Sequence, residues 1–265
     1  MISSTAEATA APAPRAEAPH AIEVQGLCKS FGDNHVLQGI DLAFPTGSTT
    51  VILGGSGSGK SVLMKHLIGL LRPDRGRVLV EGRDIGELEG KALTDLRSKF
   101  GMVFQWAALF DSMSVLENVA FPLREHRKDL SEAQIRQLVA KKLALFDLRG
   151  VEDKFPSDLS GGMRKRVGLA RAIVMDPRIV LYDEPTTGLD PITTDYVDEM
   201  IKTAQKSLGV TSVVISHDVA SAFNIADYIA FLYDGQIVAY GPPDTVKGSE
   251  HPFVDRFLGT WFRKR

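Results

Sequence analysis

The stretch Gly54-Gly55-Ser56-Gly57-Ser58-Gly59-Lys60-Ser61 decides the fold. It fits the eight-position phosphate-binding loop, and it lies between a short apolar run, Thr49 to Leu53, and a run with helical spacing, Ser61 to Leu71. The glycines let successive backbone N–H groups surround phosphate oxygens at the positive N-terminus of a helix. Lys60 adds a point charge, and Ser61 offers a hydroxyl to magnesium. A glycine-rich turn without a ligand is the alternative, but a chance match in this chain is on the order of one in a hundred.

Strand-like and helix-like runs alternate along most of the rest of the chain, which predicts an α/β fold with a mainly parallel, helix-covered sheet. Ile179 to Tyr182 and Thr211 to Ser216 are further apolar strands of that sheet. Tyr228 to Tyr233 and Gln236 to Tyr240, joined by the Asp234-Gly235 turn, predict an antiparallel hairpin.

Between Ala107 and Arg171 the strand signals nearly vanish. Three segments there suit helices instead, and they are Leu116 to Leu123, Glu132 to Phe146 and Met163 to Ala172. The sequence therefore predicts a helical insert in the α/β domain.

Composition excludes several classes of protein. The formal net charge is −2, with 31 basic and 33 acidic residues, so no bulk field would recruit nucleic acid. The single cysteine, Cys28, allows no intramolecular disulfide and suits a reducing compartment. The longest apolar stretch, Val62 to Leu71, is shorter than the roughly 20 residues of a membrane span. Residues 1–20, rich in Ala and Pro, lack the features of a secretory signal, and we expect them to form a disordered tail.

A pair of carboxylates follows the predicted strand Ile179 to Tyr182, at the edge where ligands gather in open α/β sheets. Asp183 is assigned to the magnesium shell, and Glu184 to polarising the attacking water. Alone, an Asp-Glu pair after a strand is more often a helix-capping turn. Together with the phosphate-binding loop, the pair indicates hydrolysis of a nucleoside triphosphate.

A third motif, Leu159-Ser160-Gly161-Gly162-Met163, opens the predicted helix Arg164 to Ala172. Together with Gln105 and Gly188-Leu189-Asp190, it closely resembles the ABC ATPase family. The resemblance spans about Ile22 to Gly241 and rests on the order and spacing of six motifs.

The resemblance implies a RecA-like P-loop NTPase core that carries an antiparallel β-subdomain and a helical subdomain at about residues 106–172. We expect the ATPase domain to occupy residues 21–250. Residues 251–265 would then form a basic and aromatic tail, with a solvated tail favoured over a contact with lipid headgroups or a subunit.

The same resemblance implies the residue roles. Catalysis would involve Glu184, the switch histidine His217 and the Q-loop residue Gln105. Magnesium would bind Ser61, Gln105 and Asp183. ATP would contact an adenine-stacking aromatic, the phosphate-binding loop, the signature motif and the D-loop, namely Phe31, Gly54, Gly55, Ser56, Gly57, Ser58, Gly59, Lys60, Ser61, Ser160, Gly161, Gly162 and Asp190.

Ser160 also has a physical interpretation. With Gly161 and Gly162 it makes a second anion-binding helix start, although Lys60 already has a phosphate site of its own. A purely structural Ser N-cap is the alternative. Two phosphate-binding helix starts on one chain favour a nucleotide clamped between two copies. Most family members carry Gln where this chain has Met163, whose side chain cannot repeat the hydrogen bonds of that glutamine.

Longer segments narrow the resemblance to the ATPases of bacterial Mla/Mce-type lipid-trafficking transporters. They are residues 104–113, 117–126, 163–166, 183–192 and 216–219. This resemblance implies a homodimer that uses ATP and Mg²⁺ on the cytoplasmic face of the inner membrane. Its partners would be an integral membrane permease and a substrate-binding subunit with an Mce domain, and not nucleic acid.

The apolar run Trp106 to Phe110, directly after Gln105, could receive a permease helix, with ordinary core packing as the alternative. Two other functions stay open. A soluble ABC ATPase of cofactor assembly fits the length of the chain. A P-loop kinase of small molecules would leave the signature and the D-loop without a role.

Overall fold

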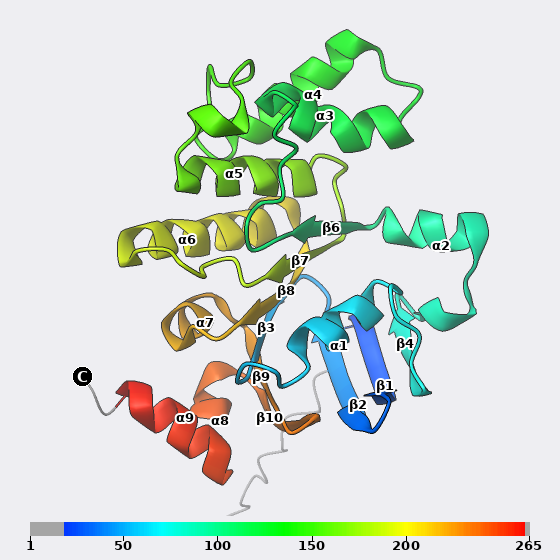
Figure 1. Ribbon diagram of the computed structural model, residues 1–265, viewed down its shortest axis with the longest axis vertical. Helices are drawn as coiled ribbons and strands as arrows, with labels where there is room; N and C mark the ends of the chain where they lie inside the picture. The colour runs from blue at the N-terminus through cyan, green and yellow to red at the C-terminus, as the bar shows by residue number, and fades with distance from the viewer. Residues whose placement is uncertain (1–18, 263–265) are drawn as a thin grey trace, which may run out of the picture.

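The computed structural model describes residues 19–262, and a six-stranded sheet runs through its middle (Figure 1). The strand order is β10-β9-β3-β8-β7-β6, and only the β9–β10 pair in this sheet is antiparallel. Its strands are β3 (Thr49–Leu53), β6 (Phe100–Val103), β7 (Ile179–Asp183), β8 (Thr211–Ser216), β9 (Tyr228–Tyr233) and β10 (Gln236–Gly241). The predicted parallel sheet and the C-terminal hairpin are confirmed.

A second, four-stranded antiparallel sheet has the order β2-β1-β4-β5. Its strands are β1 (His20–Phe31), β2 (Asn34–Pro45), β4 (Arg75–Val80) and β5 (Arg83–Asp84). The two sheets are joined where β2 meets the β9–β10 hairpin: Gln38 N–H donates to Gly235 O at 2.8 Å, and Tyr240 Oη donates to Ala43 O at 2.7 Å.

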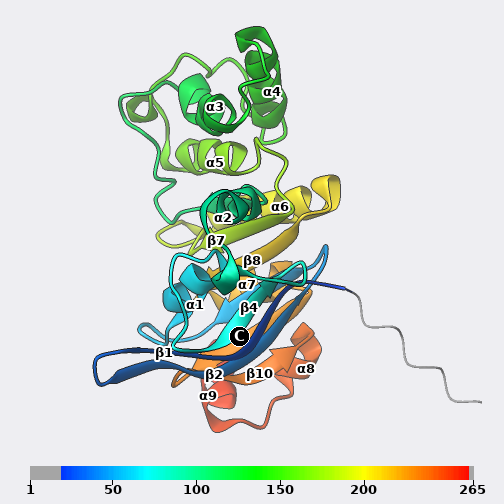
Figure 2. The ribbon, with the colours of Figure 1, turned by 90° about the vertical axis from the view of Figure 1, so that its right-hand side faces the viewer.

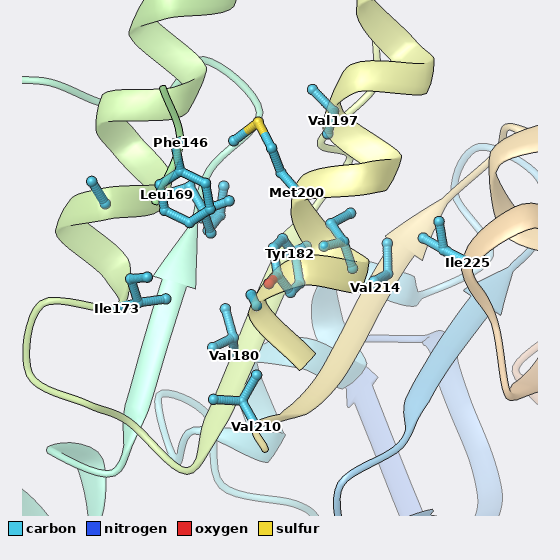
Figure 3. Close-up of a cluster of buried hydrophobic side chains, with 14 of the residues drawn as sticks. Phe146, Leu169, Ile173, Val180, Tyr182, Val197, Met200, Val210, Val214 and Ile225 are labelled. Atoms are coloured by element: carbon cyan, nitrogen blue, oxygen red, sulfur yellow. The ribbon is translucent and has the colours of Figure 1, made fainter. Parts of the chain in front are cut away.

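Strand β3 lies at the centre of the parallel sheet and is buried on both of its faces. All five of its residues are buried, as expected for a central parallel strand. Because successive side chains alternate, Val51 and Leu53 join one buried apolar cluster while Ile52 joins the other. The first cluster includes the helical subdomain, and Figure 3 shows part of it, where Tyr182 of β7 lies near Met200 of the helix Pro191–Leu208. The second cluster joins the parallel sheet to the antiparallel one.

The helical subdomain lies at the end of the molecule away from the antiparallel sheet (Figure 2). It consists of α3 (Val115–His126), α4 (Glu132–Ala144) and α5 (Gly161–Ala172). Capping boxes start the first two helices, with Ser114 paired to Glu117 and Ser131 paired to Gln134. As predicted, the structure has no strand between residues 107 and 171.

The remaining helices cover the sheet edges and faces. They are α1 (Lys60–Leu67), α2 (Gly90–Arg97), α6 (Pro191–Leu208), α7 (Val219–Ile225), α8 (Pro243–Lys247) and α9 (Pro252–Phe262), with 3-10 turns at Ile85–Glu87 and Pro156–Asp158. Helix α1 ends four residues earlier than the predicted Leu71, because Gly69 adopts a left-handed φ of 66°. Among the described residues, no helix combines the length and the apolar character needed to cross a membrane.

The two ends of the described chain differ from the predicted tails. His20 already pairs with Pro45 in the antiparallel sheet, and residues 1–18 lie outside the described part. At the other end, the expectation of a solvated tail is wrong for residues 252–262, which form α9. Val254 and Leu258 of this helix are buried in the core, because apolar residues recur on one of its faces. The basic residues Arg263, Lys264 and Arg265 lie outside the described residues.

Candidate functional site

An open cleft of about 670 Å³ lies at the carboxyl edge of the parallel sheet. Loops that follow β3, β6, β7 and β8 meet there, which is where ligands bind in open α/β sheets. The lining residues are Val36, Ser56, Gly57, Ser58, Gly59, Lys60, Ser61, Val62, Gln105, Glu184, Thr187 and His217. The cleft therefore brings together most of the phosphate-binding loop and all three predicted catalytic residues.

The phosphate-binding loop has the backbone shape that its glycines permit. Gly57 and Gly59 have left-handed φ values of 78° and 102°, and Gly59 is the residue at which α1 starts. Gly54 passes so close to the neighbouring strand that a Cβ there would lie 2.4 Å from Leu232 O. No side chain caps α1, and its first residues, Lys60 to Val62, line the cleft, so its free N–H groups can bind an anion there.

Lys60 occupies the centre of that loop. Its Nζ donates to Gly54 O at 2.8 Å and to Gly55 O at 3.0 Å. Burial lowers the pKa of Lys60, while the nearby Glu184 and Asp183 carboxylates oppose that shift. The ammonium is thus held by neutral carbonyls beside two carboxylates, where a phosphate group would be a stronger partner.

Glu184 comes directly after β7 and has a left-handed φ of 51°. Its N–H donates to Ile215 O at 3.0 Å, which fixes the backbone to β8. Thr187 Oγ1 donates to Glu184 Oε2 at 2.9 Å, and His217 Nδ1 lies 2.7 Å from the same oxygen. Both contacts are made to Oε2, so one oxygen of the carboxylate is fixed by the neighbouring loops.

Asp183 is a half-buried carboxylate at the end of β7. Burial and the neighbouring Glu184 raise its pKa, and Lys65 and Lys60 partly offset this rise. No cluster of three or more His, Cys, Asp or Glu side chains suited to a metal occurs among the described residues. Magnesium, however, commonly binds one or two carboxylates together with substrate phosphates and water. Asp183 does not line the cleft itself, but it directly precedes the cleft-lining Glu184, and Ser61 and Gln105 line the same cleft.

The predicted signature residues lie elsewhere. Ser160 Oγ accepts the N–H of Met163 at 3.2 Å and so caps α5, and the N-terminus of this helix does not line the cleft. Asp190 caps α6 in the same way, accepting the N–H of Thr193 at 3.0 Å. A Cβ on Gly162 would lie 3.6 Å from Thr193 Cγ2, so the two helix starts are neighbours. Met163 packs against the buried core cluster.

Phe31 is also not among the cleft-lining residues. Phe31 is 49% exposed, and Lys29 Nζ lies 5.6 Å from its ring centroid. The sequence interpretation gave no individual role to Val36 or Thr187, which do line the cleft. Thr187 lies three residues after Glu184, and this spacing was the available signal for a side-chain contact. Val36 reaches the cleft from β2, a distant strand, and no local pattern marks it.

Comparisons with known proteins agree with this geometry. Residues 37–187 match the family model described as ABC transporter. Mkl of Mycobacterium leprae, a probable ribonucleotide transport ATP-binding protein, is 47% identical over 90% of this chain and 68% of its own length. MlaF of Haemophilus influenzae, an intermembrane phospholipid transport system ATP-binding protein, is 42% identical over 89% of each chain.

Solved structures give the same assignment. The bacterial ABC transporter cassette MJ0796, solved as a dimer, matches with a TM-score of 0.76 and 31% identity, covering 83% of this chain and 98% of that chain. A dimeric post-hydrolysis state of the same cassette, bound to ADP and Pi, matches with a TM-score of 0.75 and 30% identity over the same shares of the two chains.

Proposed function

Because this chain belongs to the ABC transporter family and is an ATPase, we propose that two copies clamp two ATP molecules and drive an integral membrane permease that moves lipids. The observation that carries the proposal is the position of the two helix starts. One, at α1, opens into the cleft, and the other, at α5, lies outside it.

Within the cleft, we assign the triphosphate to the N-terminus of α1 and to Lys60. Glu184 acts as the general base that takes a proton from the attacking water. Thr187 and His217 hold its carboxylate by Oε2, which orients the group before ATP binds. His217 is then also placed to donate to a γ-phosphate oxygen. The signal between nucleotide and permease is assigned to Gln105, which lines the cleft after β6.

Ser61, Asp183 and Gln105 would hold magnesium next to the phosphates. When bound, the ion would neutralise charge on the β- and γ-phosphate oxygens. It would also relieve the repulsion between Asp183 and Glu184, the neighbouring carboxylate that raises the pKa of Asp183.

The second helix start requires a second copy of the chain. Ser160, Gly161 and Gly162 do not line this chain's own cleft, so they would contact the nucleotide of the partner. Asp190, at the neighbouring start of α6, would lie in the same interface. The dimeric state of the similar MJ0796 cassette supports this arrangement. Phe31 stacks on adenine in this proposal, since its exposed ring belongs to the antiparallel sheet beside the cleft.

The surface for the permease would be a second hollow of about 690 Å³ between α2, the segment after β6 and α3. Phe104, Phe110 and Phe121 lie in it and are 40%, 43% and 37% exposed. Such a contiguous apolar surface suits the apolar face of a partner helix. Leu109, in contrast, packs against the core, so its replacement would test folding rather than docking.

Helix α5 holds the segment that joins this hollow to the nucleotide site. Ala107 and Ala108, just after Gln105, have left-handed φ values of 61° and 46°. Arg171 donates to their carbonyl oxygens at 2.6 and 2.8 Å. A Cβ on Gly168 would lie 3.0 Å from Ala107 Cβ, a tight contact, so glycine favours this close approach. Movement of the residues that line the apolar hollow would therefore also displace Gln105.

Two candidate functions differ in the molecule that is transported. MlaF, which this chain matches over 89% of each length, is named for phospholipid transport, whereas Mkl is named for probable ribonucleotide transport. We favour lipids because the longer segments around Gln105 and the signature resemble lipid-trafficking ATPases. The chain would then be peripheral on the cytoplasmic face of a bacterial inner membrane, with a permease and an Mce-domain subunit as partners. A cofactor-assembly ATPase is the alternative that needs no permease.

The experiment is reconstitution of the full chain with candidate permeases in phospholipid vesicles. Co-purification with one of them, and ATPase activity that rises with phospholipid but not with ribonucleotides, would support the proposal. Phe110→Glu should abolish co-purification, while Phe155→Glu, at another exposed aromatic residue, should retain it. Activity that needs no membrane partner would favour the cofactor-assembly alternative, and stimulation by ribonucleotides would favour the function named for Mkl.

A further inference from the structure

Lys165 links the signature helix to the catalytic loop of the same chain. It lies one turn into α5, after the Ser160 cap, and its Nζ donates to Pro185 O and to Thr187 O, the latter at 3.4 Å. These two carbonyls flank Thr186, which is buried. The segment that follows Glu184 is thus attached to a helix whose N-terminus lies outside the cleft.

The group that makes this attachment is the Lys165 ammonium, and it contacts backbone carbonyls and not a carboxylate among the described residues. Lys165 is half-buried, its Nζ donates to the two carbonyls, and burial lowers its pKa. A half-buried ammonium needs such acceptors to compensate for lost water. Because these bonds join α5 to the loop, movement of α5 would change the position of the loop.

The loop in turn fixes Glu184. The left-handed backbone at Glu184 does not hold the carboxylate by itself, and the Thr187 hydroxyl donates to Oε2 at 2.9 Å. Thr187 is the same residue whose carbonyl accepts from Lys165. A continuous series of hydrogen bonds therefore runs from α5 through Lys165 and Thr187 to the carboxylate of Glu184.

We propose that Lys165 is a positioning residue that couples the two nucleotide sites of a dimer. This inference rests on the proposed function, in which the N-terminus of α5 contacts the partner's ATP. Closure of α5 on that ATP would set the loop of this chain's own Glu184 through Lys165. Each active site would then respond to the occupancy of the other one.

The test compares Lys165→Met with the wild-type full chain and with Lys165→Arg, using ATP and Mg²⁺ as the only ligands. Met keeps the apolar stem and removes the charge, whereas Arg keeps the charge. Lys141→Met, at an exposed lysine of α4, is the matched control. The measurements are kcat, KM and the Hill coefficient for ATP, together with thermal stability. ATP-dependent dimerisation is measured in a Glu184→Gln background.

We expect Lys165→Met to form the ATP-bound dimer normally and to keep KM. Its kcat should fall about 10- to 100-fold, since misplacing a reacting group by about an ångström costs up to two orders of magnitude. The Hill coefficient should fall towards one, because the coupling between sites is lost. Lys165→Arg should recover both quantities, and Lys141→Met should match the wild type.

Three results would overturn the inference. Unchanged kcat and cooperativity would show that Lys165 positions nothing. A lower kcat with the cooperativity of the wild type would show positioning without coupling. Loss of the folded protein or of the dimer in Lys165→Met would assign Lys165 a structural role. Failure of the proposed function looks different, since the wild type itself would then form no ATP-dependent dimer.

Discussion

Helices α1 and α5 both begin with glycine-rich segments, but their N-termini are built differently. Gly59 starts α1 in a left-handed conformation, and no side chain caps it. Ser160 starts α5 in an extended conformation, and its hydroxyl accepts the N–H of Met163. The first helix start lies in the cleft with Lys60, whereas the second does not line it.

Because of this difference, one chain can carry two anion-binding helix starts with separate roles. An uncapped N-terminus with a buried lysine leaves N–H groups for a ligand that arrives within the same chain. A serine-capped N-terminus is stable without a ligand, so it can stay exposed on the surface until a ligand from another chain binds it. The comparison predicts different consequences for changes at the two positions.

The largest effect should come from Glu184→Gln, which removes the general base beside the α1 site. Turnover should fall by about 10²- to 10⁴-fold, the contribution typical of general acid–base catalysis. ATP binding should remain, so the variant should accumulate an ATP-bound dimer in which α1 and α5 of different copies meet. ATPase assays and light scattering measure these quantities. Near-normal hydrolysis would remove Glu184 from its assigned role.

The affinity of the monomer for ATP should depend on the start of α1 and not on the start of α5. Lys60→Ala should weaken binding by about 1.5–3 kcal/mol, or roughly 10- to 150-fold, because hydrogen bonds to a charged group are lost. Ser160→Arg should leave this affinity unchanged and block the homodimer, in which both shared sites carry the lesion. Calorimetry at protein concentrations below dimerisation gives both values. Equal losses in the two variants would contradict separate roles.

Asp183→Asn should raise the stability of the ligand-free protein near neutral pH. The pKa of Asp183 is raised in the folded state by burial and by Glu184. Its contribution to stability is therefore full below the unfolded pKa and is lost as pH rises through the folded pKa. The ionised carboxylate destabilises the fold at neutral pH. The Tm difference between variant and wild type should shrink towards about pH 4, the ordinary pKa of aspartate, and a gap independent of pH would contradict this cause.

The smallest effect concerns the caps themselves. Ser160→Ala should cost about 1 kcal/mol of unfolding free energy, the usual value of a serine N-cap. Ser58→Ala in the phosphate-binding loop should cost nothing, since Ser58 Oγ is buried without a hydrogen-bond partner among the described residues. Urea denaturation of both variants checks the comparison, and a similar loss in each would show that the two helix starts are capped alike.

Features set by short segments could be predicted from the sequence. The phosphate-binding loop, the buried strand Thr49–Leu53 and the β9–β10 hairpin each depend on neighbouring residues, and the structure has all three. Helix α9 also had a local signal, because Val254 and Leu258 are spaced for one helix face. The basic residues after it directed the interpretation towards a solvated tail instead.

Tertiary contacts could not be predicted in this way. The approach of His217 to Glu184 joins the ends of two parallel strands, and the sequence indicated only that both residues lie at that edge. The bonds from Lys165 to Pro185 and Thr187 join a helix to a loop about 20 residues away, with no spacing rule between them. Such pairs follow from how the elements pack, which no local pattern encodes.

Mixing two inactive variants tests the central claim, that the two helix starts serve different nucleotides. Lys60→Ala and Ser160→Arg are each expected to be inactive as homodimers. A hybrid of the two places both lesions in one shared site and leaves the other site entirely wild type. Differently tagged copies that co-purify after mixing with ATP must first show that hybrids form.

We expect ATPase activity to return when hybrids form. This expectation would be contradicted by hybrids that stay inactive while a hybrid of wild type with Lys60→Ala keeps half of the wild-type activity, because each site would then lie within one chain. If that second hybrid is inactive too, the two sites cooperate strictly, and the ATP-bound dimer of Glu184→Gln becomes the decisive species. Its loss on adding Ser160→Arg is the predicted result, and its persistence would contradict the account.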